Sequence, residues 1–564
     1  MKLSRALGLV GISICTAGMP HLAAAGGLLL PGAGAVSTSR AGAAVASVDD
    51  GEALVINPAG LAKTTGTTIT VSAAMLSYAL EFQRRGTYDN VPGQSYPYAG
   101  QPFALAKNDA SPPLGLGSVQ PVPVIAVVSD LGGVVPGLHV ALGFYAPNAY
   151  PFRDMCVDGT GGCKKPTFNG DPNIAPLATR YDIVEQEAAI IAPSLGIAYR
   201  ILPQLDVGLR LSAGRADLKS TTGLWGTLTP NYEEDIQKDG QFRVDAKDSF
   251  VPTFGLGVTF RPTPTLEVAA SYSYGFDIHA KGTATSQLGA GAGLPGMPVV
   301  VAPVPDAMAR CAPGGTEAEL KACVDLALPM TAQLAGRYKF LDAAGQLKGD
   351  VEVNLDWENW GKSCGEDAFA DGSCASPSDY RVVVDGAVST RGATGDLVPL
   401  LKLQDATVRH GLQDTYGVRV GGSYHLAVGA PREDHTSNEV ILRGGLGYET
   451  AAAKTGWLRA DLDGAARTTI TLGAGYRTRR FEINAGGGVI LEGSPSNPNV
   501  GGGAEPCNPT NAAPGCGAGG AAINQGPNPI NPVLTPDNQN ESPVAQGDYK
   551  AHYTMFMLGV TTWF

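Results

Sequence analysis

The sequence predicts an all-β protein, a 14-stranded antiparallel transmembrane β-barrel with a small N-terminal hatch inside its lumen. Apolar residues recur at every second position over stretches of ten to sixteen residues, whereas strands of soluble proteins average roughly 5–6. The connections between these stretches alternate between long and short. The chain is rich in glycine (75 of 564 residues) and only 16% of it is charged. A helical membrane protein is excluded, because no run of about 18 apolar residues occurs beyond the N-terminus.

The charge balance limits the partners of the chain. It carries 40 basic and 52 acidic residues, a formal net charge of −12, and no lysine- and arginine-rich run. Because binding to phosphates requires clustered positive charge, we expect no nucleic-acid partner.

The first 25 residues are expected to be a secretory signal peptide that is removed. Basic residues precede an apolar run over 6–19, and the small residues 23–25 resemble a cleavage site. The run is too short for a membrane anchor. Lipid attachment at Cys15 is disfavoured by the bulky residue before it.

The eight cysteines that remain after Cys15 is removed form four local couples. They are Cys156 with Cys163, Cys311 with Cys323, Cys364 with Cys374, and Cys507 with Cys516. An even number at short spacing in an exported chain predicts four disulfides. The couples contain no C-x-x-C motif and have no histidine nearby, so we expect no metal site. No phosphate-cradling loop or dinucleotide motif occurs either, so we expect no cofactor.

Fourteen strands follow from the alternation. The predicted strands are 67–82, 121–131, 138–148, 187–200, 205–218, 250–261, 266–281, 329–340, 349–361, 408–427, 439–450, 468–478, 481–492 and 549–564. The long connections are 83–120, 149–186, 219–249, 282–328, 362–407, 451–467 and 493–548, and they contain all four cysteine couples. Short turns on one side and long loops on the other are typical of bacterial outer-membrane barrels. The predicted barrel comprises residues 67–564. A closed barrel is also the only sheet that satisfies its backbone hydrogen bonds in lipid.

Two segments outside the strands have their own predictions. Thr316 to Leu328 is predicted to be a short helix, since Thr316 and Glu319 match a capping box. Residues 26–66 are rich in glycine and alanine and too few to form a stable domain alone. They are either a disordered periplasmic tail or a plug inside the barrel. The plug is the more economical interpretation, because fourteen strands enclose more space than side chains fill.

Several short motifs occur in order along the chain. They are Ser39-Arg40-Ala41-Gly42-Ala43, Asp49-Asp50, Asn57-Pro58-Ala59-Gly60-Leu61, Gly143-Phe144-Tyr145-Ala146-Pro147, Asp356-Trp357-Glu358-Asn359-Trp360 and Leu442-Arg443-Gly444-Gly445-Leu446-Gly447-Tyr448-Glu449. With the fourteen strands and the terminal Phe564, a membrane-assembly signal, this order resembles the FadL/TodX-type outer-membrane transporters (OmpP1/FadL/TodX). The motif Asn57, Pro58, Ala59 resembles the end of that family's hatch, just before strand one.

The resemblance implies passive uptake of hydrophobic compounds, such as long-chain fatty acids or aromatic hydrocarbons, across the bacterial outer membrane. In that family, the outer loops after strands five and seven capture the ligand, and hatch movement opens a sideways route at a kinked third strand. The corresponding loops here are 219–249 and 282–328. Their candidate groove residues are Leu224, Trp225, Leu228, Leu288 and Leu294. The alternative is that these side chains only pack the loops together.

Individual residues carry two further expectations. Pro147 stands at the end of strand three, where its missing N–H interrupts the ladder, and marks either the kink or simply the end of the strand. For a fatty acid, a cation should meet the carboxylate. The candidates are Arg40, Arg153 and Arg443. The alternative for each is an ion pair in the lumen, with Asp49 or Glu449 as partners.

Three other function classes fit the sequence less well. An enzyme is disfavoured, because the G-x-S-x-G match at 361–365 lies after a barrel strand and not at a strand-to-helix elbow. A general diffusion porin would need a charged, water-filled lumen. An adhesin or structural barrel would suit the long loops, but it predicts no hydrophobic pocket beneath them.

The expected partners are a hydrophobic small molecule, outer-membrane lipid and lipopolysaccharide, and the expected state is a monomer.

Overall fold

The computed structural model describes residues 28–90, 97–113, 115–168, 173–226, 234–294, 297–363, 375–429, 437–462, 464–497, 527, 529–533 and 544–564. The expected signal peptide and Leu228 lie outside these residues. Four of the eight cysteines beyond the expected signal peptide also lie outside them, namely Cys364, Cys374, Cys507 and Cys516. Among the described residues, no helix is long and apolar enough to cross a membrane.

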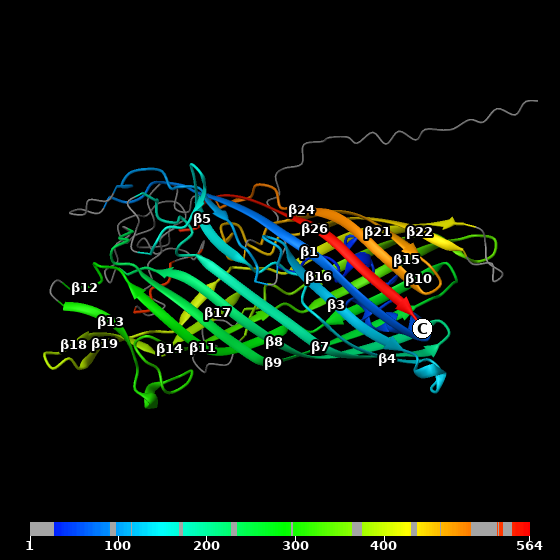
Figure 1. The fold of residues 1–564 in the computed structure, drawn as a ribbon, viewed down its shortest axis with the longest axis horizontal. Coiled ribbons are helices and arrows are strands. Elements are labelled where there is room, and N and C mark those ends of the chain that lie inside the picture. The colour runs from blue at the N-terminus through cyan, green and yellow to red at the C-terminus, as the bar shows by residue number, and fades with distance from the viewer. Residues whose placement is uncertain are drawn as a thin grey trace, which may run out of the picture.

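Fourteen antiparallel strands form a closed barrel, as the sequence predicts (Figure 1). The wall strands in chain order are β1 (Thr67–Arg84), β3 (Gln120–Ser129), β4 (Leu138–Tyr145), β7 (Glu185–Leu202), β8 (Leu205–Leu224), β9 (Gly240–Phe260), β10 (Leu266–Ser273), β15 (Thr331–Leu341), β16 (Leu347–Glu358), β21 (Thr415–Val428), β22 (Asn438–Glu449), β23 (Arg467–Arg477), β24 (Phe481–Leu491) and β26 (Gly547–Trp563). Each pairs with the next, and β26 pairs with β1 from Thr68↔Trp563 to Arg84↔Gly547. The terminal Phe564 extends this seam, because its N–H donates to the Thr67 carbonyl at 2.9 Å.

The alternation within the strands separates a lipid face from a lumen face. On β7, Leu195, Ile197 and Tyr199 are exposed on the outside, while Ser194 and Ala198 at alternate positions are buried inside. Bulky apolar side chains therefore meet lipid, and small or polar ones face the lumen, as expected for an outer-membrane barrel.

Further strands lie beyond one end of the barrel. They are β2 (Ala106–Asn108), β5 (Arg153–Gly159), β6 (Gly162–Lys164), β11 (Phe276–Leu288), β12 (Gly293–Leu294), β13 (Met297–Pro303), β14 (Leu320–Leu328), β17 (Asp379–Val384), β18 (Gly386–Arg391), β19 (Leu397–Lys402), β20 (Ala406–Arg409) and β25 (Ser496–Asn497). Residues 240–247 of β9 pair with β11, and β11 pairs with β14. In turn, β14 pairs with β17 and β17 with β20. Strands β12, β13, β18 and β19 form a separate sheet that projects from the same end (Figure 1).

These outer strands explain where the sequence prediction was wrong. Residues 320–328 form β14 and not a helix, since β11 and β17 both pair with this segment. The capping-box residues instead close a turn, in which the Glu319 N–H donates to Thr316 Oγ1 at 3.1 Å. Likewise, the strand predicted from 408 begins at Thr415, because β20 belongs to the outer extension.

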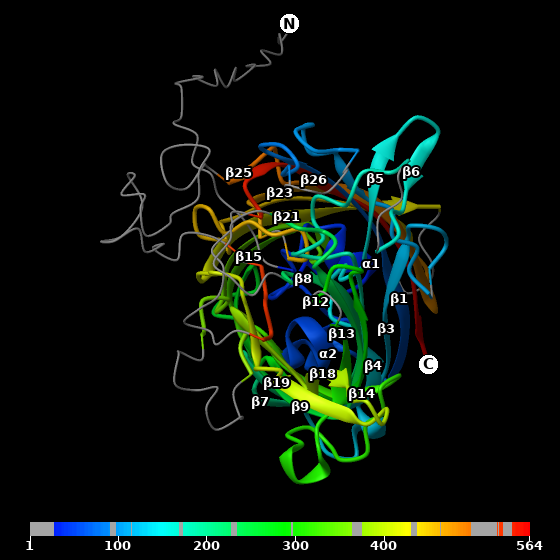
Figure 2. The same cartoon turned by 90° about the vertical axis from the view of Figure 1, so that its left-hand side faces the viewer.

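The N-terminal segment (residues 28–66) lies inside the ring of strands (Figure 2). It contains α1 (Ala35–Thr38), α2 (Ala53–Ile56) and the 3-10 helix η1 (Pro58–Lys63), whereas η2 (Leu131–Gly133) and η3 (Asp306–Met308) lie in connections. Most of its residues are buried, including charged ones. The segment is therefore enclosed by the barrel and does not extend from it as a tail.

Glycines on the lumen face leave room for the backbone of this segment. A Cβ at Gly208 of β8 would stand 2.2 Å from the Pro58 carbonyl carbon, and one at Gly445 of β22 would stand 2.2 Å from the Arg40 carbonyl carbon. Wall and segment are thus in backbone contact on both sides.

We predict that Gly208→Val displaces the N-terminal segment while the barrel still assembles. The added side chain overlaps the Pro58 backbone, and overpacking of this kind costs about 1–3 kcal/mol. Cells that carry the variant should become more sensitive to small hydrophilic antibiotics, while the purified protein keeps the heat-modifiable migration of a folded barrel. The control is Gly336→Val on β15, where a Cβ meets no atom within 4 Å. Equal antibiotic sensitivity of the two variants would contradict the prediction.

Candidate functional site

Ion pairs fasten one side of the N-terminal segment to the barrel wall. Arg40 donates to Asp350 at 2.9 and 3.0 Å, and Glu352 lies 3.4 Å away. Lys63 lies 3.6 Å from Glu267 on β10. All of these side chains are largely buried, and losing one partner of a buried pair costs about 3–5 kcal/mol.

The motif Asn57, Pro58, Ala59 fixes the turn that precedes the first strand. The Asn57 amide donates to the Val45 carbonyl at 2.8 Å and to Thr259 Oγ1 at 3.3 Å, and its Oδ1 accepts from the Ala59 N–H at 3.1 Å. Pro58 begins η1, where the first backbone N–H would have no helical partner. The motif thus caps η1 and ties it to β9.

The other two candidate arginines also have partners. Arg443 donates to Asn484 and to Glu482, each at 2.6 Å, within the wall. Arg153 donates to the carbonyls of Ala460, Tyr150 and Phe152 at 2.9–3.1 Å, and it is 1% exposed. The structure therefore places all three candidates, Arg40 included, in contacts with protein groups.

The barrel wall is interrupted between β4 and β7. The ladder pairs Tyr145 with Ala192, and it resumes only where Arg153 of β5 pairs with Gln186. Between these points, residues 146–152 leave the wall, and residues 187–191 have no ladder partner on that side; the structure describes both segments fully. Pro147 lies in the departing segment.

Prolines remove the hydrogen-bond donors along this break. The Pro123 carbonyl accepts from the Ala146 N–H at 3.2 Å, so the N and O atoms of Pro123 face the departing strand. Pro121, two residues earlier, faces the same way because strand residues alternate. Neither proline has an N–H to leave unsatisfied. Two prolines inside a predicted strand are the signal by which the sequence could have indicated an open edge here.

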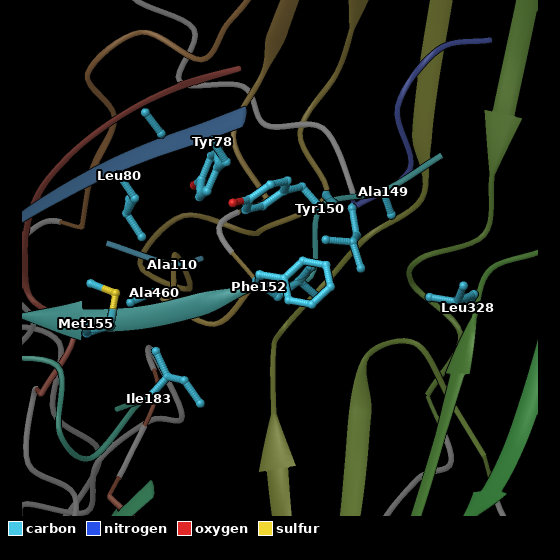
Figure 3. Packing of buried hydrophobic residues seen from close by; sticks show 14 of the residues in the cluster. Tyr78, Leu80, Ala110, Ala149, Tyr150, Phe152, Met155, Ile183, Leu328 and Ala460 are labelled. Atoms are coloured by element: carbon cyan, nitrogen blue, oxygen red, sulfur yellow. The ribbon is translucent and has the colours of Figure 1, made fainter. Parts of the chain in front are cut away.

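The departing segment turns inward and holds the start of the N-terminal segment. The Asn148 side-chain amide donates to the carbonyls of Leu30, Pro31 and Gly32 at 3.0–3.4 Å, and the backbone carbonyl of Asn148 accepts from the Leu30 N–H at 2.6 Å. Tyr150 packs on Tyr78, with ring centroids 6.1 Å apart (Figure 3).

A large apolar cavity lies beside the break. Its volume is about 430 Å³, within the roughly 300–1,000 Å³ that small-molecule sites have. Its apolar lining includes Val122, Pro123, Ala146, Pro147, Ala149, Phe152, Ile183, Ala188, Ile190, Leu224, Phe242, Val244, Ile278, Val324, Leu326, Leu328, Val382, Val384, Leu403 and Ile530. The consecutive residues 186–191 of β7 all line it. Because neighbouring strand residues point to opposite faces, the cavity reaches the uncovered edge of β7.

The candidate loop residues contribute to this cavity unequally. Leu224 lines the cavity. Leu288 packs against the buried hydrophobic cluster to which Leu224 belongs. Trp225 is 1% exposed and packs on Tyr181, with ring centroids 5.3 Å apart, away from the lining. Leu228 and the side chain of Leu294 lie outside the described residues. Much of the lining comes from β14, β17 and the break, which sequence patterns did not bring together.

Two of the four expected disulfides lie in the described residues, and both are formed. Cys156–Cys163 joins β5 to β6, and Cys311–Cys323 joins a loop to β14. Both lie in the outer extension. The other two expected pairings stay predictions, because their cysteines lie outside the described residues; these are Cys364 with Cys374 and Cys507 with Cys516.

One corner of the cavity is polar. Arg459 lies 2.5 Å from Asp182 and 3.0 Å from Asp461, and His410 lies 2.9 Å from Asp461. Burial, together with the charge of Asp461, raises the pKa of Asp182 to about 7, although Arg459 acts in the opposite direction. Burial alone would raise the pKa of Asp461 too, but Arg459 and His410 hold it below its usual value.

Comparison with known proteins gives the family and the fold. A protein-family model described as outer membrane protein transport protein (OMPP1/FadL/TodX) matches residues 176–486, more than half of the 564 residues. No curated protein matches the chain. The fold is similar to that of a Pseudomonas aeruginosa FadL homologue (14% identity, TM-score 0.61, 95% of this chain and 100% of that chain covered). It is also similar to the toluene transporter TbuX of Ralstonia pickettii (14% identity, TM-score 0.52, 95% and 99% covered) and to the toluene transporter TodX of P. putida (14% identity, TM-score 0.52, 94% and 98% covered).

The family match covers the part of the chain that builds most of the wall, and the structural similarity extends over nearly all of it. Both concern transport channels and not enzymes. The chain belongs to the OMPP1/FadL/TodX family of outer membrane transport proteins, and it is an integral β-barrel of the bacterial outer membrane.

Proposed function

We propose that this protein mediates the passive uptake of hydrophobic compounds, fatty acids or aromatic hydrocarbons among them, across the outer membrane. A compound enters among the outer loops, binds in the apolar cavity and leaves sideways through the break between β4 and β7 into the bilayer. The N-terminal segment is the hatch that blocks the lumen and controls this route.

The observation that carries the proposal is the position of the cavity. It lies among outer strands at one end, and its lining includes an edge of β7 that none of the described strands covers. A solute that takes this route never passes through the polar lumen, where burying an apolar molecule among charges would be unfavourable. No energy source is required when the concentration gradient is favourable.

The apolar cavity also distinguishes uptake from the other function classes. An adhesin needs no enclosed hydrophobic pocket beneath its loops. A diffusion porin needs an open aqueous lumen, whereas the N-terminal segment occupies the lumen here. The solved structures of the toluene transporters TbuX and TodX share the fold, which supports a hydrophobic solute.

We predict that Ala188→Trp blocks the route. Ala188 lines the cavity from β7, and a cavity of this size cannot hold both an indole and a solute, so we expect initial uptake to fall by about tenfold. The measurement is the uptake of radiolabelled toluene and of a radiolabelled long-chain fatty acid by cells that lack their own transporters of this kind. The matched control is Ala474→Trp on the outer face of β23, which should leave uptake unchanged. Undiminished uptake by Ala188→Trp would rule out this cavity as the route.

We further predict that Asn148→Ala loosens the start of the N-terminal segment. The variant loses the side-chain hydrogen bonds to residues 30–32, each with a net value of about 1 kcal/mol. Amide hydrogen exchange at Leu30 should accelerate, and uptake should rise. Asn438→Ala, which removes an exposed amide bonded to Tyr476, serves as the control. Unchanged exchange at Leu30 would show that Asn148 does not hold the segment.

A further inference from the structure

The polar corner of the cavity, formed by Asp182, Arg459 and Asp461, is a built feature of the outer loops. Asp182 precedes β7, while Arg459 and Asp461 lie between β22 and β23. The three side chains are at most 7% exposed, and all three line the cavity. Backbone N–H groups fix both carboxylates, since Ala460 donates to Asp182 and Leu462 donates to Asp461 at 2.8 Å.

The cations of the cavity already have anionic partners. Each guanidinium nitrogen of Arg459 is engaged: Nε with Asp461 at 3.0 Å, Nη2 with Asp182 at 2.5 Å and Nη1 with the Arg409 carbonyl at 3.2 Å. Lys219, the other cation in the described lining, lies 3.6 Å from Glu187. With two cations and three carboxylates (Asp182, Glu187 and Asp461), the described lining has a formal excess of one negative charge.

An anionic headgroup is therefore at a disadvantage in this cavity. To reach Arg459 it would have to displace Asp182 or Asp461, and either carboxylate would then remain buried without its cation, which is strongly unfavourable. A hydroxyl group meets no such obstacle. An ionised carboxylate offers about four lone-pair positions, so Asp182 can accept a hydrogen bond from a neutral donor while keeping Arg459.

We propose that the cavity selects uncharged hydrophobic compounds, including those with a hydroxyl group, over carboxylates, and that Asp182 is a residue that determines this selectivity. The inference rests on the proposed uptake function and narrows its substrate class. Asp182 is the determinant rather than Asp461, because Asp461 is also held by His410 at 2.9 Å. The raised pKa of Asp182 agrees with this assignment, since negative charge is already disfavoured at the corner.

The test compares two ligands that share a chain length and differ in headgroup charge. Binding of octan-1-ol and octanoate to the full-length protein, held in amphipol at pH 8.5, is measured by isothermal titration calorimetry. At this pH octanoate is ionised, since carboxyl groups titrate near pH 4. The wild type should bind octan-1-ol at least about tenfold more tightly than octanoate. In Asp182→Asn, octanoate affinity should rise by about tenfold, while octan-1-ol affinity stays within about twofold.

Two further variants keep the test decisive. Glu187→Gln removes a second carboxylate from the lining without touching the Arg459 cluster, so it should raise octanoate affinity in the same direction even if Asp182→Asn fails to fold. Glu317→Gln removes an equal charge from an exposed pair with Arg391 on the outer sheet, and it should change neither affinity.

The outcomes separate this inference from the proposed function. Equal binding of the two ligands by the wild type, or unchanged octanoate affinity in both lining variants, would overturn the selectivity while leaving uptake of hydrophobic compounds supported. Binding of neither ligand by the folded wild type would overturn both.

Discussion

The structure depends on one constraint, that backbone polar groups in a bilayer need hydrogen-bond partners within the protein. The continuous ladder from β1 round to β26 and back meets it. At the break beside β7 the ladder of hydrogen bonds is interrupted. Pro121 and Pro123, which have no N–H, lie along one edge of the break. The departing segment recovers partners by turning inward, where Asn148 bonds residues 30–32. An opening in the wall is thus tolerated because the chain removes or redirects the groups that lipid would not satisfy.

Much of the barrel could be predicted from the sequence, because a strand between lipid and lumen must alternate at every second residue. β22 and β24 begin and end within a residue of their predicted bounds. The outer extension was harder to predict, since outside the bilayer both faces of a strand can be covered by other loops. Leu320, Ala322 and Val324 alternate as a strand does, yet the nearby Thr316 and Glu319 also match the start of a helix, and only pairing with β11 and β17 decides between them.

The cavity was beyond sequence reasoning for a different reason. Its lining joins residues as distant in the chain as Val122, Val324 and Ile530, and no periodic pattern relates them. The roles of the candidate arginines could not be predicted from the sequence either. A buried cation is tolerated only with partners, so an arginine in a lumen is more often matched by the wall than kept for a ligand, as Arg40 with Asp350 and Arg443 with Glu482 illustrate. Sequence suggested which residues carry charge, and only the fold determined which charges meet.

The unequal attachment of the N-terminal segment has a mechanical meaning. On the side of β10 and β16 it is held by buried ion pairs. Leu54, Leu61 and Ala62 pack on β3, β4 and β7 through apolar contacts, together with a hydrogen bond from Arg200 of β7 to the Ala62 carbonyl at 2.6 Å. Ion pairs depend on direction and distance, while apolar surfaces can slide past each other with little change in buried area. The segment is therefore held by charged pairs at the wall of β10 and β16, and by apolar contacts and hydrogen bonds, those of Asn148 among them, next to the break. Because a hydrogen bond contributes about 1 kcal/mol, whereas breaking a buried ion pair costs about 3–5 kcal/mol, the attachment next to the break is the one that costs least to release.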